Sequence, residues 1–151
     1  MSCCCEKKVN IDIKYHSDEI ERLRYIDEKS DWIDLRSAKK YELKAGDFAL
    51  IDLGVSMRIP DGYEAHVAPR SSTFKTWGLI QTNSVGIIDN SYSGTNDIWM
   101  MPVYATRDTT IEINDRVCQF RIMKKQPVIT FNETDQLDDK HRGGFGSTGK
   151  Q

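Results

Sequence analysis

The chain has 151 residues, enough for one domain with a hydrophobic core and too few for two ordinary domains. A hydrophobic fraction of 38%, a charged fraction of 29% and a net charge of −2 predict a soluble globular protein without the basic surface of a nucleic-acid-binding protein. No apolar run reaches the length of a membrane span, and the first ten residues contain no apolar signal segment. The sequence therefore predicts a cytoplasmic protein with no membrane partner.

The four cysteines give no framework for disulfide bonds or for a zinc site. Cys3, Cys4 and Cys5 are adjacent and Cys118 stands alone, so no C-x-x-C pair exists, and the three histidines lie far apart in the sequence. A reducing compartment suits this set of cysteines. The run at residues 3–5 is interpreted as part of a disordered start rather than as an acylation site.

Two short elements are predicted before the main β region. Apolar and polar side chains alternate over residues 9–15, which is the periodicity of a strand. Residues 17–29 are predicted to form a short helix that is capped by Ser17, with Ile20 and Leu23 facing the core.

From Trp32 onward the sequence is typical of β structure. Apolar-rich runs alternate with turn signals at a spacing of roughly 8–12 residues, which favours a sandwich or barrel over alternating strand–helix units. We therefore expect one all-β domain over residues 1–131, with one short helix at most. The apolar runs are residues 48–59, 63–69, 78–88, 98–105 and 116–123, and the turns are residues 44–47, 59–62, 91–97 and 112–115.

Residues 132–151 have a different composition from the rest of the chain. They are polar and acidic at first and then glycine-rich, with four of the ten glycines between residues 143 and 149. Such a segment cannot form a core of its own, so we interpret it as a flexible arm. Residues 144–150 read G-x-x-x-x-G-K, but Gln151 follows where a nucleotide-binding loop needs Ser or Thr and a helix.

One candidate phosphate-binding group follows the run at residues 63–69. Arg70, Ser71 and Ser72 offer a planar guanidinium and two hydroxyl groups, which suit phosphate oxygens. The simpler alternative is a loop whose serines bond their own backbone and whose arginine is solvated. The three residues alone favour this alternative.

A second candidate group lies in the stretch NSVGIIDNSYSG. Gly86, Ile87 and Ile88 lead into a turn at Asp89, and a hairpin of this kind can present backbone groups to a flat base. Asp89 could orient a water molecule, and Tyr92 could pack against a sugar ring. The alternative is a turn aspartate that bonds its own backbone, followed by a half-buried tyrosine.

Two polar residues lie within apolar surroundings. Asp34 should either be buried with partners or help to hold a cation. Gln119 lies within an apolar strand and either binds a ligand or simply faces outward.

In chain order, the motifs IDLRSA, PRSS, NSVGIIDNSY, DRVCQF and GGFGSTG resemble the five ordered motifs of the trimeric dUTP pyrophosphatases (dUTPases). They run from Asp34 to Gly149. The stretches DWIDLR, EAHVAPRSSTF and NDIWMMPVYATRDT are similar to the branch found in Gram-positive bacteria and their phages. The resemblance implies a jelly-roll β-barrel that assembles as a homotrimer with shared active sites. It also implies hydrolysis of dUTP to dUMP and pyrophosphate with Mg²⁺, which limits uracil in DNA and supplies dUMP for dTMP synthesis.

The resemblance implies a role for each motif residue. Asp89 would activate the water that attacks the α-phosphorus, and Asp34 would reach Mg²⁺ through water. Tyr92 would pack under the deoxyribose. The residues implied to bind phosphate are Arg70, Ser71, Ser72 and Gln119, and those implied to bind uracil are Asn83, Gly86, Ile87 and Ile88. The arm residues implied to close over a neighbouring subunit's site are Arg142, Phe145, Gly146, Ser147 and Thr148.

Two features depart from the family pattern. The arm reads HRGGFG rather than R-G-x-G-G-F-G, which leaves the phosphate contact of Arg142 open. The turn after Tyr92 reads SGTND instead of a shorter G-E, and Trp99 and Met100 follow it. These two residues form a second candidate for the lid over uracil, beside Phe145.

Three alternatives to a dUTP hydrolase remain. A dCTP deaminase shares the fold, although Asp89 and Tyr92 favour the uracil hydrolase. A nucleotide-sensing regulator that binds another protein is a second, and the SGTND turn is a candidate contact surface for it. A carbohydrate-binding jelly roll is a third, and it leaves the arm and the PRSS loop unexplained.

Overall fold

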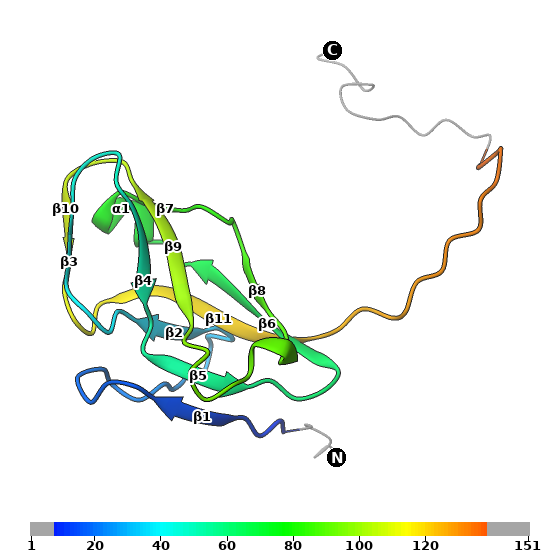
Figure 1. Ribbon diagram of the computed structural model, residues 1–151, viewed down its shortest axis with the longest axis horizontal. Helices are drawn as coiled ribbons and strands as arrows, with labels where there is room; N and C mark the ends of the chain where they lie inside the picture. Colours follow the sequence, from blue (N-terminus) through cyan, green and yellow to red (C-terminus); the bar gives the residue numbers. More distant parts are fainter. Residues whose placement is uncertain (1–7, 139–151) are drawn as a thin grey trace, which may run out of the picture.

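The structure is a computed structural model that describes residues 8–138. It contains eleven strands and one short α-helix within those residues, so the all-β prediction is confirmed (Figure 1). The strands are β1 (Asp12–Tyr15), β2 (Ile33–Arg36), β3 (Tyr41–Leu43), β4 (Phe48–Asp52), β5 (Val55–Arg58), β6 (Tyr63–Pro69), β7 (Leu79–Gln81), β8 (Gly86–Ile88), β9 (Met100–Ala105), β10 (Thr109–Ile111) and β11 (Arg116–Lys124). The helices are α1 (Thr73–Trp77) and a 3₁₀ turn, η1 (Asn90–Tyr92).

The strands form one four-stranded sheet, one three-stranded sheet and two pairs. The four-stranded sheet has the order β2-β11-β6-β8 and the three-stranded sheet the order β4-β9-β7, while β1 pairs with β5 and β10 with β3. All of these pairings are antiparallel. Side chains alternate in burial along β6 and β9, as expected when one face of a sheet covers a core. This layered arrangement is the jelly-roll type that the motif resemblance implies.

The core is one cluster that both sheets share. The three-stranded sheet contributes fully buried residues such as Ile51 and Met101, and the four-stranded sheet contributes Leu35 and Val67. Cys118 also belongs to this cluster, and burial raises the pKa of its thiol. It is therefore a packed core residue and an unreactive thiol.

The helix predicted over residues 17–29 is wrong. This segment has no helix, and the backbone N–H groups of Glu19, Glu21, Leu23 and Lys29 bond to side chains instead of to carbonyls one turn earlier. The N–H of Glu21 donates to Asn114 Oδ1 and the N–H of Leu23 donates to the Tyr15 hydroxyl, both at 2.8 Å. Ile20 is buried as expected. The one short α-helix is α1, which Gly78 ends in a left-handed conformation with φ of 68°.

The long run at residues 48–59 divides into two strands. Gly54 lies between β4 and β5 with φ of 70°, and a Cβ built on it would lie 2.9 Å from the Ala38 Cβ. Only glycine fits both the conformation and the space. The chain therefore leaves the three-stranded sheet at this point and pairs with β1.

The outer face of the β4-β9-β7 sheet is apolar. Phe48, Tyr104 and Ile80 are neighbours across the three strands, with relative exposures of 61%, 44% and 48%. Leu50 and Pro102 form the next row on the same face. An antiparallel sheet with a solvated outer face normally carries polar residues there, so this face has the character of an interface.

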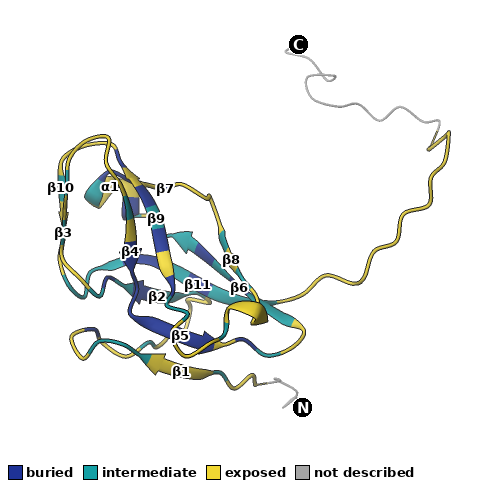
Figure 2. Cartoon of the chain, in the orientation of Figure 1, coloured by how far each residue is buried: buried dark blue, intermediate teal, exposed yellow. Residues whose placement is uncertain are grey.

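The chain leaves the body of the protein after β11. Residues 125–138 contain no strand or helix and run away from the sheets (Figure 1), and they are exposed along their length (Figure 2). Val128 and Phe131 are 95% and 90% exposed. The predicted boundary between domain and arm, at residue 131, falls inside this segment.

Within residues 8–138 there is no helix whose length and apolar character would let it cross a membrane.

Candidate functional site

The predicted phosphate-binding residues meet at one end of the four-stranded sheet. Asp34 in β2 is opposite Gln119 in β11, which is opposite Ala68 in β6. Arg70 follows the end of β6 directly. Strand pairing therefore places Asp34, Gln119 and Arg70 side by side, although they are far apart in the sequence.

Asp34 is held between two arginines. Its Oδ1 lies 3.2 Å from Arg70 Nε and its Oδ2 lies 3.1 Å from Arg116 Nη1, while its side chain is only 11% exposed. A carboxylate this well buried needs such partners. The sequence offered burial with partners or a cation as alternatives for Asp34, and the structure shows the partners. Arg116 is a residue of this cluster that the sequence analysis did not single out.

The loop after β6 is fixed by backbone and hydroxyl contacts. The N–H of Arg70 donates to Thr73 Oγ1 at 2.8 Å, and the Thr73 hydroxyl donates to the Val117 carbonyl at 3.0 Å. Ser72 precedes α1 but makes no side-chain capping bond. Ser71 is exposed. The loop thus holds Arg70 in place and leaves the two serine hydroxyls available to a ligand.

Gln119 is half-buried and partly engaged. Its Nε2 donates to the Pro69 carbonyl at 3.0 Å. An amide nitrogen carries two hydrogens, so one donor remains for a ligand.

The candidate base-binding group is the turn that connects β7 to β8, which we call the β7–β8 turn. The hairpin expected here is wrong, because β7 pairs with β9 in one sheet and β8 pairs with β6 in the other. Between these strands the chain turns through Asn83 and Ser84, the latter with φ of 62°. Asn83 is exposed and Gly86 is half-buried, and a Cβ at Gly86 would lie 3.4 Å from Asn83 Nδ2. Glycine therefore keeps open space beside the Asn83 amide.

Asp89 precedes the 3₁₀ turn η1, and Tyr92 is its last residue. The hydroxyl and the backbone N–H of Ser91 both donate to Asp89 Oδ1 and lower the pKa of that carboxyl. Asp89 is therefore an exposed, ionised carboxylate at neutral pH. The Tyr92 hydroxyl donates to the Ile98 carbonyl at 2.8 Å, which fixes its half-exposed ring.

The two groups lie at opposite ends of β6. Asp89 follows Ile88, which pairs with Ala65, whereas Arg70 follows Pro69. The five-residue step from Ala65 to Arg70 spans roughly 16 Å along a strand. One chain therefore does not bring its own Asp89 to its own Arg70.

Of the two candidates for the lid over uracil, the structure describes the pair Trp99 and Met100 and not Phe145. Trp99 is fully buried and packs edge-on against Phe120 at a centroid distance of 5.3 Å, so its prediction as a lid is wrong. Its neighbour Met100 is exposed on the outer face of the sheet. The arm residues Arg142, Phe145, Gly146, Ser147 and Thr148 lie outside the described residues.

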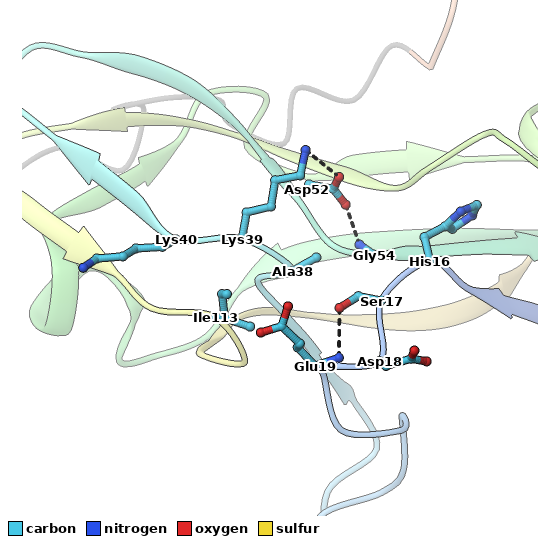
Figure 3. Close-up of a pocket in the computed structure, with 10 residues that line it drawn as sticks. All are labelled: His16, Ser17, Asp18, Glu19, Ala38, Lys39, Lys40, Asp52, Gly54 and Ile113. Carbon is cyan, nitrogen blue, oxygen red and sulfur yellow. Dashed lines mark hydrogen bonds and ion pairs between the residues drawn. The ribbon is translucent and has the colours of Figure 1, made fainter.

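A separate cavity of about 710 Å³ lies near the start of the chain (Figure 3). Lys39 and Asp52 face each other at its wall, with Nζ 3.5 Å from Oδ2, and Asp52 also accepts a bond from the Gly54 N–H. Of the predicted site residues within 8–138, none lines this cavity. Asp18, Glu19 and Asp52 bring negative charge to its lining, and Asp52 occupies Lys39, so it is a poor site for a triphosphate.

The sequence and the fold match one family. A family model described as dUTPase matches residues 20–149. The SPbeta prophage-derived deoxyuridine 5'-triphosphate nucleotidohydrolase of Bacillus subtilis (strain 168) is 54% identical over 141 residues, covering 93% of this chain and 99% of that protein. Its phage origin agrees with the branch that the motifs resemble.

Two solved phage structures share the fold. The dUTPase of Staphylococcus bacteriophage 80alpha with dUPNHPP has a TM-score of 0.75 at 19% identity, covering 94% of this chain and 99% of the other. It is described among phage dUTPases that control transfer of virulence genes by a G protein-like mechanism. A mutant dUTPase from phage phi11 of S. aureus, described as coordinating a structural Mg(II) ion, has a TM-score of 0.67 at 18% identity, covering 87% of this chain and 98% of the other. With its motifs, its fold and this breadth of similarity, the chain belongs to the dUTPase family.

Proposed function

We propose that the protein hydrolyses dUTP to dUMP and pyrophosphate in sites shared between subunits. The observation that carries this proposal is the placement of two complementary half-sites at opposite ends of β6. One half-site holds cations and hydroxyls around Arg70, and the other holds the β7–β8 turn, β8 and Asp89. Membership of the dUTPase family indicates that the substrate is dUTP.

Asp89 acts as the general base in this proposal. Its carboxylate is exposed, and the bonds from Ser91 keep it ionised, so it can accept a proton from a water molecule. The same bonds fix the orientation of the carboxylate. The water then attacks the α-phosphorus, and pyrophosphate leaves.

Arg70, Ser71, Ser72 and Gln119 bind the phosphate chain. The Arg70 guanidinium is held by Asp34 and by a bond from its Nη1 to the Arg116 carbonyl at 3.2 Å. A preorganised cation counters the charge that develops on the leaving pyrophosphate. Arg116 serves as the second support of Asp34 and so of this arrangement.

The residues present fit a Mg²⁺ ion that the nucleotide itself carries in. Within residues 8–138, no group of three or more His, Cys, Asp or Glu side chains is placed to hold a metal. Asp34, the implied metal residue, is already engaged by two guanidinium groups. Mg²⁺ keeps several waters and binds mainly through substrate phosphates, so an outer contact from Asp34 through water suits it. When bound, the ion supplies charge neutralisation on the phosphate oxygens.

The β7–β8 turn, β8 and Tyr92 bind the base and the sugar. Asn83 and the backbone at Gly86, Ile87 and Ile88 contact the edge of uracil. The Tyr92 ring, fixed by its bond to Ile98, packs under the deoxyribose and leaves no room for a 2′-hydroxyl.

A homotrimer completes the sites. The separation of roughly 16 Å along β6 requires a second chain, and the apolar outer face of the β4-β9-β7 sheet offers a surface to bury. In the proposed trimer, the arm of a third chain closes over the bound nucleotide, with Phe145 as the lid on uracil.

The deaminase alternative is not supported by the family match. A regulatory protein contact is a second candidate role, supported by the description of the phage 80alpha enzyme and by the exposed turn at residues 93–97. In that turn, Gly94 and Asp97 bond each other in both directions, so it is a preformed surface feature.

The test of the proposed function is pyrophosphate release measured side by side from dUTP, UTP, dTTP and dCTP. We expect dUTP to be the preferred substrate by a factor of at least about 10², since a buried site that hydrogen-bonds its substrate rejects mismatched analogues strongly. Ammonia release from dCTP would contradict the proposal. Equal turnover of UTP and dUTP would show that Tyr92 does not exclude a 2′-hydroxyl.

A further inference from the structure

Gln81 is a buried polar residue at the start of the β7–β8 turn. It ends β7 and is only 5% exposed. Neither the motif resemblance nor the proposed mechanism gives it a role. A buried amide at this place is costly unless it is hydrogen-bonded, so its partners are informative.

The orientation of the Gln81 amide is fixed by the backbone. Its Nε2 donates to the Val67 carbonyl of β6 at 2.9 Å, and a second carbonyl, that of Ser84, lies 3.4 Å away. Carbonyl oxygens only accept hydrogen bonds, so the nitrogen must face them. Turning the amide over would place its oxygen, which has no partner among residues 8–138, against both carbonyls.

This orientation in turn fixes Asn83. The Gln81 Nε2 also donates to Asn83 Oδ1 at 3.0 Å. Since the oxygen of the Asn83 amide is used as the acceptor, its Nδ2 is left to face a ligand. That nitrogen lies on the side of Gly86, in the space that glycine keeps open at the β7–β8 turn.

We propose that Gln81 is a positioning residue that determines base specificity. By holding the Asn83 amide with its nitrogen outward, Gln81 makes the β7–β8 turn present a hydrogen-bond donor. Uracil has an acceptor oxygen at C4, whereas cytosine has an amino donor there, so a fixed donor accepts the first base and opposes the second. This inference rests on the proposed function, in which Asn83 contacts the base edge.

The test compares Gln81→Met with the parent in the full-length protein. Methionine fills the buried space without the amide, so the Asn83 amide can turn over. We expect the ratio of kcat/KM for dUTP to kcat/KM for dCTP to fall about tenfold, the worth of one hydrogen bond. The kcat for dUTP should stay within about twofold of the parent, since Gln81 does not touch the reacting groups. Gln81→Leu is the second variant, and Thr82→Ala, at the exposed neighbouring position, is the control that should leave the ratio unchanged.

Asn83→Ala separates the two ways in which the idea can fail. One outcome is that Asn83→Ala lowers the ratio of kcat/KM for dUTP to kcat/KM for dCTP, while both Gln81 variants fold and assemble like the parent and leave this ratio unchanged. The role of Gln81 is then wrong and the proposed function stands. If Asn83→Ala also leaves discrimination unchanged, the assignment of Asn83 fails, and the role of Gln81 fails with it. Both variants unfolding would show Gln81 to be a structural residue and would overturn the inference.

Discussion

Replacing Asp89 with asparagine should abolish most dUTP turnover while dUTP still binds. Asparagine keeps the shape of the side chain and can still accept the bonds from Ser91, but an amide cannot take a proton from water. Loss of a general base typically costs roughly 10²–10⁴-fold in rate. The measurements are kcat from pyrophosphate release and Kd for dUTP from calorimetry.

Asp97→Asn is the matched control for this prediction. Asp97 is another turn aspartate, and it bonds the Gly94 N–H rather than facing a ligand. This variant should turn over dUTP within a few-fold of the parent. If Asp89→Asn did the same, the base would lie elsewhere in the protein.

Placing a charge at Tyr104 should dissociate the protein and remove its activity. Tyr104 lies between Phe48 and Ile80 in the middle row of the apolar face. In the proposed trimer this face is covered, and an unpaired buried carboxylate is strongly unfavourable. We expect Tyr104→Glu to give monomers in light scattering and no measurable dUTP hydrolysis.

The control is Thr110→Glu, at an exposed position of β10. It adds the same charge to a strand outside the apolar face and should leave both mass and activity unchanged. A Tyr104→Glu protein that stays trimeric would show that this face is not the interface. Active monomers would contradict the shared site.

Sequence patterns predicted the β class and most strand positions well. Runs such as residues 63–69 and 116–123 carry both β-forming residues and alternating burial, so local preference and packing agree. The helix predicted over residues 17–29 failed because tertiary contacts with Tyr15 and Asn114 replaced the local hydrogen bonds. Pattern reasoning has no access to such long-range partners.

Part of the site was predicted from the sequence. That prediction came from the resemblance to the family motifs and not from the periodicity of apolar residues. Arg70, Asp34 and Gln119 do come together, because strand pairing aligns them. Arg116 and Gln81 were missed, since an arginine in a strand and a glutamine before a turn are ordinary until their partners are known. Trp99 was only a second lid candidate, chosen as an aromatic residue near a turn, and its burial in the core could not be read from that position.

The most direct test of the shared site mixes two inactive variants. Asp89→Asn removes the base at one end of β6, and Arg70→Ala removes the phosphate clamp at the other end. The two proteins are unfolded together in equal amounts and refolded, so that trimers contain both kinds of chain. A site whose Asp89 comes from one chain and whose Arg70 comes from another is then intact in about a quarter of cases by random assembly. We predict that the mixture regains about a quarter of the parental dUTP hydrolysis, whereas a mixture as inactive as either variant alone would contradict the account.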